Sequence, residues 1–238
     1  MPVGAIPDRI AAIAWEQVRV MIEERGYATT APLLSAEECA ELIAVYEDRA
    51  RFRSRVDMAR LRYGVGEYKY FANPLPPIVA TLRESLYPHV APIANEWMKA
   101  LKRDDRFPAS LGEFTARCDR EGQAKPTPLL LRYAAGGYNC LHQDFYGAIV
   151  FPIQFTIMLS RPREDFDGGE FLLVEQRPRA QSRGEAIALR QGEAILFATR
   201  YLPVQGSRGY YRVNVRHGVS RIERGHRVTL GVIFHDAK

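Results

Sequence analysis

The stretch Arg132-Tyr-Ala-Ala-Gly-Gly-Tyr-Asn-Cys-Leu-His-Gln-Asp144 ends with an imidazole and a carboxylate two residues apart. On a strand, residues i and i+2 point to the same face, so His142 and Asp144 can reach one metal ion. A third ligand from a later strand would complete the two-histidine, one-carboxylate face that binds Fe(II) and leaves coordination positions open. Because His-x-Asp triplets are common by chance, the alternative interpretation is a polar turn after an apolar strand.

The chain around and after this stretch has the pattern of a β-protein. From Pro128 onward, short apolar runs are separated by Gly, Asp and Pro. The predicted strands are 129–134, 139–145, 149–160, 170–175, 186–189, 194–198, 211–219 and 227–234. Several short strands with turns between them indicate a sandwich or a barrel.

The residues before Pro128 are predicted to be mainly helical. Apolar residues recur at helical spacing over residues 8–25, where Asp8 can cap the helix and Gly26 can end it. Tyr27–Thr30 is expected to be extended. Ser35-Ala-Glu-Glu38 forms a capping box that begins a second helix, roughly 36–50.

A third helix is predicted over residues 78–101, interrupted at Pro88 and Pro92. Residues 102–126 have the composition of a connecting loop with a short helix. The sequence therefore predicts an α+β protein with two regions in one integrated domain. Residues 1–127 would form an N-terminal helical support and substrate lid, and residues 128–238 the β-core.

Composition limits the class of protein. The 238 residues are 47% hydrophobic, which is enough for one substantial core. The sequence contains no run of 18 apolar residues, so no transmembrane helix is expected. The N-terminal residues lack the pattern of a signal peptide. The cysteines are scattered and form neither a disulfide framework nor a zinc motif: Cys39, Cys118 and Cys140. We expect a cytoplasmic protein without membrane association, and no pattern predicts its oligomeric state.

The charge favours an anionic partner. The net charge is +5 and the pI about 9.2, and of 33 basic residues only five are lysine. Arginine suits phosphate recognition because its guanidinium is planar and always charged. A nucleic-acid partner is one explanation, and an arginine-rich genome composition is the other.

Two neighbouring patterns could belong to a nucleic-acid surface. Four arginines occupy alternate positions and would share one face of an extended segment: Arg49, Arg51, Arg53 and Arg55. Tyr63–Phe71 is rich in aromatic residues and glycine, and predicts an edge hairpin over a pocket with Tyr68 and Tyr70 on one face. Aromatic rings between basic residues can stack bases. A solvated basic face and ordinary strand packing are the alternatives.

The third metal ligand is expected near the C-terminal end of the chain. His217 ends one predicted strand, and a second strand begins near Arg227. Arg227 and Thr229 share a face of that strand, where a guanidinium beside a hydroxyl can bind a carboxylate.

Two other histidines, His226 and His235, are weaker candidates for this ligand. His226 should point away from the face that Arg227 occupies, and His235 has no strand after it to carry an arginine. His89 lies in the helical region on no metal pattern, and is expected to pack or to lie at the surface.

These pieces together resemble the Fe(II)/2-oxoglutarate-dependent oxygenases. His217 follows Asp144 by 73 residues and Arg227 follows His217 by ten, separations that are ordinary for that family. The resemblance covers about residues 128–236. It implies a double-stranded β-helix core (jelly-roll, cupin-like). It also implies His142, Asp144 and His217 as iron ligands and catalytic residues, with Arg227 and Thr229 as ligands of 2-oxoglutarate.

The same resemblance implies the cofactors and the reaction. Fe(II), 2-oxoglutarate and O₂ would be needed, with ascorbate as a reductant in assays. The oxygenase would hydroxylate its substrate and release succinate and CO₂.

Two subgroups share local motifs with the chain. The stretch from Arg132 to Asp144 is similar to the AlkB-type nucleic-acid dealkylases, whose matching stretch runs Asn-Arg-Tyr-Ala-Pro-Gly…Leu-His-Gln-Asp. That similarity implies that Tyr133 contacts 2-oxoglutarate, although Leu131 replaces the asparagine. Phe166-Asp-Gly-Gly-Glu-Phe171 is similar to the Gly-Gly-Glu turn of prolyl-4-hydroxylase-like members. The whole chain is most similar to a bacterial branch for which action on alkylated nucleic acid has been suggested.

The substrate stays open between two classes. Oxidative demethylation of alkylated or single-stranded nucleic acid would be a DNA-repair activity, whereas hydroxylation of a prolyl residue would leave a stable alcohol on a protein or peptide. A non-catalytic β-barrel binding module and a cupin-like metal enzyme that does not use 2-oxoglutarate are further alternatives. If residues 49–71 line the entrance to the metal site, the nucleic-acid hypothesis gains support.

Overall fold

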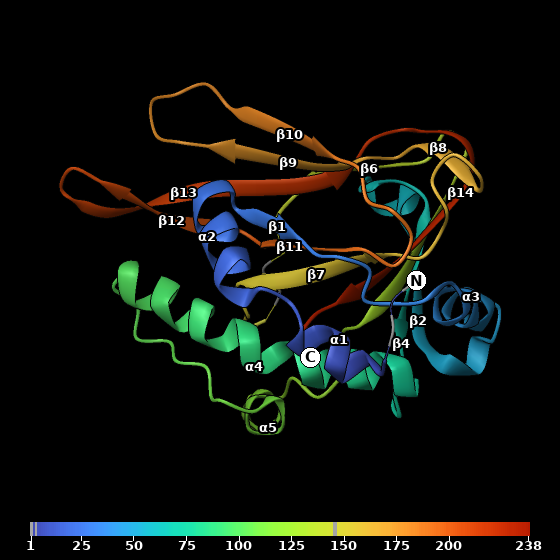
Figure 1. Ribbon diagram of the computed structural model, residues 1–238, viewed down its shortest axis with the longest axis horizontal. Helices are drawn as coiled ribbons and strands as arrows, with labels where there is room; N and C mark the ends of the chain where they lie inside the picture. Colours follow the sequence, from blue (N-terminus) through green and yellow to red (C-terminus); the bar gives the residue numbers. More distant parts are fainter. Residues whose placement is uncertain (1, 3, 145–146) are drawn as a thin grey trace.

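Two antiparallel β-sheets and five α-helices make up the described part of the protein, which in this computed structural model is residue 2, residues 4–144 and residues 147–238 (Figure 1). The larger sheet has the order β1-β11-β7-β14-β5-β4-β2, with β8 paired to β14. Its strands are β1 (Tyr27–Thr29), β2 (Phe52–Asp57), β4 (Glu67–Phe71), β5 (Leu129–Ala134), β7 (Ile153–Met158), β8 (Phe166–Gly168), β11 (Ala194–Ala198) and β14 (Ile222–Val232).

The smaller sheet has the order β10-β9-β13-β6-β3, with β12 paired to β13. Its strands are β3 (Gly64–Val65), β6 (Tyr138–His142), β9 (Phe171–Gln176), β10 (Arg183–Ile187), β12 (Tyr201–Gly206) and β13 (Gly209–Val219). Each predicted strand after Pro128 corresponds to one of these strands, although residue 145 of the predicted strand 139–145 lies outside the described residues. The short strands β8 and β12 were not predicted.

The helices lie largely on one side of the larger sheet, with α4 opposite the β9–β10 hairpin (Figure 1). They are α1 (Ile6–Ala11), α2 (Trp15–Arg25), α3 (Ala36–Val45), α4 (Pro77–Ala100) and α5 (Leu111–Arg120), with 3₁₀ turns η1 (Arg49–Arg51) and η2 (Ala59–Leu61). The capping box at Ser35 and the left-handed end at Gly26 are confirmed.

The single helix predicted over residues 8–25 is wrong, because the chain breaks between α1 and α2. At the break, the Ile10 carbonyl accepts from the Ile13 backbone N–H at 3.2 Å and from the Trp15 indole N–H at 3.0 Å. Asp8 is not the cap either, since the helix begins after Ala5 and Asp8 lies in its first turn.

The predicted interruption of the third helix is also wrong, because α4 continues through Pro88 and Pro92. Both prolines are exposed, and so is Glu84. Because Pro88 has no backbone N–H, the Glu84 carbonyl lacks its helical hydrogen-bond donor. Water can satisfy the freed carbonyls on this face. The opposite face is buried, so packing keeps the helix continuous.

The four alternate arginines do not share one face. Arg49 and Arg51 lie in η1, and the pairing of β2 with β4 shifts register between Phe52 and Ser54. This shift makes Arg53 the extra residue of a β-bulge, which re-aims its side chain. The predicted hairpin is wrong as well, because β3 pairs with β6 while β4 lies between β2 and β5.

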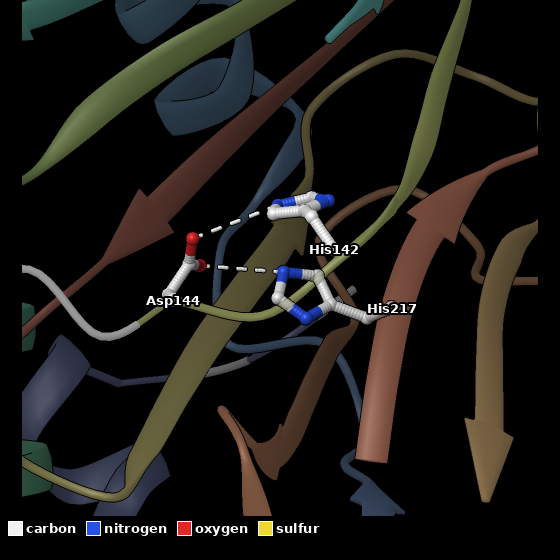
Figure 2. Close-up of side chains that lie close together, drawn as sticks. All are labelled: His142, Asp144 and His217. Atoms are coloured by element: carbon white, nitrogen blue, oxygen red, sulfur yellow. Dashed lines mark ion pairs between the residues drawn. The ribbon is translucent and has the colours of Figure 1, made fainter. Parts of the chain in front are cut away.

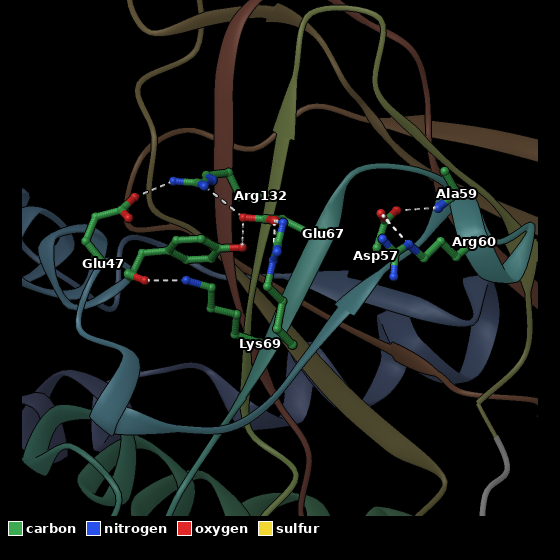
Figure 3. A network of polar contacts seen from close by, with 9 residues as sticks. Glu47, Asp57, Ala59, Arg60, Glu67, Lys69 and Arg132 are labelled. Carbon is green, nitrogen blue, oxygen red and sulfur yellow. Dashed lines mark hydrogen bonds and ion pairs between the residues drawn. The ribbon is translucent and has the colours of Figure 1, made fainter.

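A network of charged side chains joins α3, β2, β4 and β5 on the outer face of the larger sheet (Figure 3). Glu67 accepts hydrogen bonds from the Tyr46 hydroxyl at 2.8 Å and from Arg132 at 2.8 Å, and it pairs with Arg55. The Tyr46 ring also contacts the Arg132 guanidinium, 4.1 Å from its centroid. Glu67 therefore holds β4 and β5, the strands that carry Tyr68, Tyr70 and Tyr133, against α3.

None of the helices in the described ranges is long and apolar enough to cross a membrane.

Replacing Glu67 by glutamine should lower the free energy of unfolding by about 1–3 kcal/mol, because three donors lose their shared carboxylate. Urea unfolding followed by circular dichroism measures this. The control is Glu164→Gln, which breaks the exposed Arg161–Glu164 pair and should change the free energy by less than about 0.5 kcal/mol. Equal effects of the two substitutions would contradict the role given to Glu67.

Candidate metal and co-substrate site

His142, Asp144 and His217 converge at one point, as Figure 2 shows, with one ligand atom of each within 4.8 Å of the others. His142 and His217 are directly opposite each other in the pairing of β6 with β13, so both imidazoles project from the same face. Asp144 follows β6, with its carboxylate 3.6 Å from His142 Nε2 and 3.3 Å from His217 Nε2. The structure brings together the three predicted residues.

The surroundings orient these groups as metal ligands require. His142 Nδ1 lies 2.8 Å from the Cys140 carbonyl oxygen, to which only a protonated Nδ1 can donate. The proton is thereby fixed on Nδ1, and the lone pair of Nε2 faces Asp144. Gln154 Nε2 donates to Asp144 Oδ2 at 2.8 Å and fixes the carboxylate.

The protonation states also suit a metal. Burial tends to raise the pKa of Asp144, but the hydrogen bond from His217 and the charges of both imidazoles outweigh it and hold that pKa well below its usual range. Burial, followed by the neighbouring His217, lowers the pKa of His142. A carboxylate and a neutral imidazole are the forms that bind a cation.

Gln143, between the two ligands of this segment, was not singled out from the sequence. Its side-chain amide donates to the carbonyls of Arg200 and Val215, both at 2.9 Å. Val215 lies two residues before His217 on β13. Gln143 therefore ties the His142–Asp144 segment to the strand that supplies the third residue.

Arg227 is almost completely buried, and none of its three guanidinium nitrogens has a hydrogen-bond partner among the described residues. Burial lowers its pKa to about 10, so it remains charged at neutral pH. The guanidinium lies 5.8 Å from the centre of the Tyr133 ring, and Thr229 lies on the same face of β14. Because a buried unpaired charge is costly, this arrangement fits an anionic ligand such as a carboxylate.

The Gly-Gly turn after β8 allows this arrangement. Gly169 has φ +68°, and a Cβ placed there would lie 2.3 Å from Ile222 Cδ1 and 2.8 Å from Arg227 Cδ. A side chain at this position would therefore push against the arginine. The turn is explained by its packing around Arg227, whatever the substrate.

All six predicted site residues line one cavity of about 380 Å³: Tyr133, His142, Asp144, His217, Arg227 and Thr229. The predicted orientation of His226 is confirmed, because its side chain is exposed. His235 lines the cavity, and His89 lies away from it, stacked on Trp15.

Comparison with known proteins identifies the family. The family model Oxygenase-NA, described as "Oxygenase, catalysing oxidative methylation of damaged DNA", matches residues 66–237. The chain belongs to the Oxygenase-NA family. Two uncharacterized proteins of Mycobacterium tuberculosis, from strains CDC 1551 and H37Rv, are each 48% identical to it over 181 residues, which is 74% of this chain and 78% of theirs.

Solved structures show the same fold as this member of Oxygenase-NA. A prolyl-4-hydroxylase from Pseudomonas putida has a TM-score of 0.55 and 15% identity, with 94% of this chain and 100% of that chain covered. A 2OG-Fe(II) oxygenase family oxidoreductase from Burkholderia pseudomallei has a TM-score of 0.55 and 14% identity, with 95% and 93% covered.

By its family the protein is an oxygenase, and His142, Asp144 and His217 form a group that could hold a metal ion. The non-catalytic binding module is therefore set aside.

Replacing Arg227 by methionine should raise the free energy of unfolding of the ligand-free protein by about 1–3 kcal/mol, because an unpaired buried charge is removed. Urea unfolding measures it. The matched control is Arg83→Met. Arg83 is also buried, but it donates to the Ile233 and Phe234 carbonyls and pairs with Asp236. That change should lower the free energy by about 3 kcal/mol. Destabilisation by both changes would mean that Arg227 has a partner in the ligand-free protein.

Proposed function

We propose that this dioxygenase removes alkyl groups from damaged nucleic acid by oxidation, with His142, Asp144 and His217 as its iron ligands. Arg227 and Thr229, next to Tyr133, would bind the carboxylate of 2-oxoglutarate that lies away from the metal. Bound Fe(II) and 2-oxoglutarate supply the oxidising chemistry, in which O₂ and 2-oxoglutarate yield succinate, CO₂ and a hydroxylated substrate. A hydroxylated N-methyl group then breaks down to formaldehyde and the repaired base.

The donor set supports the metal assignment. Two imidazoles and one carboxylate are the ligands of non-haem Fe(II) oxygenases, and they leave positions for a co-substrate and O₂. His142 donates to the Cys140 carbonyl, and Asp144 accepts from the Gln154 side chain. Such supporting contacts fix ligand orientation and usually matter for metal affinity.

The three unpartnered nitrogens of Arg227 support the 2-oxoglutarate assignment, because a carboxylate can accept from two of them and neutralise the charge. The hydroxyl of Thr229 can add a further hydrogen bond. Tyr133 lies below the guanidinium, and burial raises its pKa to about 12, so its hydroxyl stays protonated beside the anion.

We further propose that residues 128–238 form a double-stranded β-helix, with residues 1–127 as its support and substrate lid. The two antiparallel sheets support this view, since His142 and His217 come from the smaller sheet while Arg227 comes from the larger one. From the first region, β2 and β4 supply Arg53, Tyr68 and Tyr70 to the same cavity.

The observation that carries the choice of substrate is the location of the basic and aromatic residues of 49–71. Five of them line the cavity that contains the metal residues: Arg53, Arg62, Tyr63, Tyr68 and Tyr70. Rings beside guanidinium groups suit a single-stranded nucleic acid, where bases stack and phosphates pair. The description of the Oxygenase-NA family, which names damaged DNA, supports the same class.

Arg53 is the best placed of these residues to bind phosphate. Its Nε donates to the Pro126 carbonyl at 2.8 Å, and its guanidinium lies 4.6 Å from the centre of the Tyr70 ring. Within the described residues, no carboxylate lies within ion-pair distance of Arg53, whereas Arg51 pairs with Asp48 and Arg55 with Glu67. Arg53 is thus fixed in place while its outer nitrogens can meet an anion.

Wild-type protein with Fe(II), 2-oxoglutarate and ascorbate should release succinate and formaldehyde together when given a single-stranded oligonucleotide with one N-methylated base. His142→Ala and Arg227→Ala should each reduce both products at least about 100-fold, because metal and co-substrate binding are lost. Mass spectrometry and a formaldehyde assay measure the two products.

The unmethylated oligonucleotide is the control for this assay and should give no formaldehyde. Succinate release that responds to a proline-containing peptide, and not to the methylated oligonucleotide, would replace nucleic acid by protein as the substrate.

Replacing Arg53 by glutamine should raise the KM for the oligonucleotide roughly tenfold and reduce the salt dependence of binding by about one ion, since one phosphate contact is lost. Arg51→Gln, two residues away and outside the cavity, is the matched control and should leave both values unchanged. Identical effects of the two changes would indicate general electrostatics and contradict a specific contact. Titrations at several salt concentrations measure these values.

A further inference from the structure

His235 lies in an irregular segment whose backbone carbonyls accept hydrogen bonds from side chains elsewhere in the protein. Residues 233–236 follow the end of β14 and are not part of a strand. Arg83 donates to the carbonyls of Ile233 and Phe234, and Thr127 donates to the carbonyl of His235. The backbone around the imidazole is therefore held by side chains from α4 and from the segment before β5.

One nitrogen of the buried His235 ring has a defined partner. The backbone N–H of Phe151 donates to Nδ1 at 3.2 Å, so Nδ1 must be unprotonated. The ring proton of the neutral imidazole then lies on Nε2. Burial lowers the pKa of His235 to about 4, which agrees with a neutral ring at physiological pH.

The Nε2–H group has no hydrogen-bond partner in the described ranges, although His235 is only 6% exposed and lines the cavity. Because the ring lines the cavity, this N–H group can donate to a ligand that enters the cavity. Every second residue from position 227 to 235 lines the cavity: Arg227, Thr229, Gly231, Ile233 and His235. Because roughly 16 Å of strand separates Arg227 from Val232, His235 lies at the end of the cavity opposite to the arginine.

Gln154 offers a complementary group nearby. Its Nε2 must face Asp144, because a carboxylate can only accept, so its Oε1 points the other way. That oxygen is buried and has no partner among the described residues. β7 pairs with β14 through Phe155 and Val232, and continuing this register puts Gln154 beside Ile233, two residues before His235.

We infer that His235 and Gln154 read the edge of the substrate base, His235 as a hydrogen-bond donor and Gln154 as an acceptor. The ligand edge that fits them carries an acceptor, a carbonyl oxygen or an unprotonated ring nitrogen, near an N–H donor. Planar nucleobases present such edges. This inference rests on the proposed action on nucleic acid, and it assigns base discrimination to residues beyond the metal triad.

The test compares oligonucleotides that differ only in the N-methylated base. His235→Phe keeps the ring volume but removes the donor, and it should raise the KM for the preferred base roughly tenfold. The differences in KM between bases should shrink, while the KM for 2-oxoglutarate should stay within about twofold. His235→Gln can restore an N–H donor and should recover part of the loss. The control is His226→Phe, at an exposed histidine of β14.

Nitrogen NMR of the histidine rings tests the inference without variants. With Zn(II) in place of iron, Nε2 of His235 should carry the proton, and its resonance should shift when the methylated oligonucleotide is added. Shifts around Arg53 and Tyr70 without one at His235 would overturn this inference and leave the proposed function standing. No shift anywhere in the cavity would overturn both. An equal rise in KM for every base would also contradict the reading role.

Discussion

The site depends on one register, the pairing of β6 with β13 that sets His142 opposite His217. Because strand side chains alternate with a period of two, a slip of one residue would send one imidazole to the far face of the sheet and separate the pair. The contacts around this pairing hold the register. Gln143 binds the carbonyl two residues before His217. A Cβ at Gly218 would lie only 2.7 Å from the Asn139 carbonyl oxygen, so the strands can approach this closely only with glycine there.

The cavity is built from groups that cost stability in the free protein. The buried Arg227 guanidinium and the buried Gln154 amide oxygen have no hydrogen-bond partner in the described chain, and the imidazole of His235 lines the same cavity. Hydrogen bonds nevertheless fix two of these side chains. Gln154 donates to the Asp144 carboxylate, and His235 accepts from the Phe151 backbone N–H. Groups fixed in this way lose little entropy when a ligand arrives, so the stability that they cost is recovered in binding. The network around Glu67 and the aromatic packing of α4 against Phe234 support the walls.

Much of this could be predicted from the sequence. Strand alternation grouped His142 with Asp144 and Arg227 with Thr229, because short-range periodicity decides which side chains share a face. The spacing of His217 was matched to the oxygenase family by resemblance. The same reasoning predicted the β-rich second half and the capping box at Ser35.

Other features depend on contacts that local patterns do not encode. The break after α1 involves the Trp15 indole, and the aim of Arg53 depends on a bulge in its pairing with β4. Residues 27–30, 49–55 and 63–71 were expected to be extended, but local patterns do not show that β1, β2 and β4 pair within the larger sheet. Gln143, Gln154 and His235 acquire their roles from partners distant in the sequence. His235 was considered only as a metal ligand, since a histidine next to a strand gives no sign of the backbone donor that fixes its tautomer.

The decisive experiment is a crystal structure obtained without oxygen, with Fe(II), 2-oxoglutarate and a single-stranded oligonucleotide carrying one N-methylated base. We expect the metal on His142, Asp144 and His217, a carboxylate of 2-oxoglutarate on Arg227, and the methyl carbon turned toward the metal with the flanking phosphate at Arg53. A base bound outside the cavity, or a metal held by other residues, would contradict this expectation.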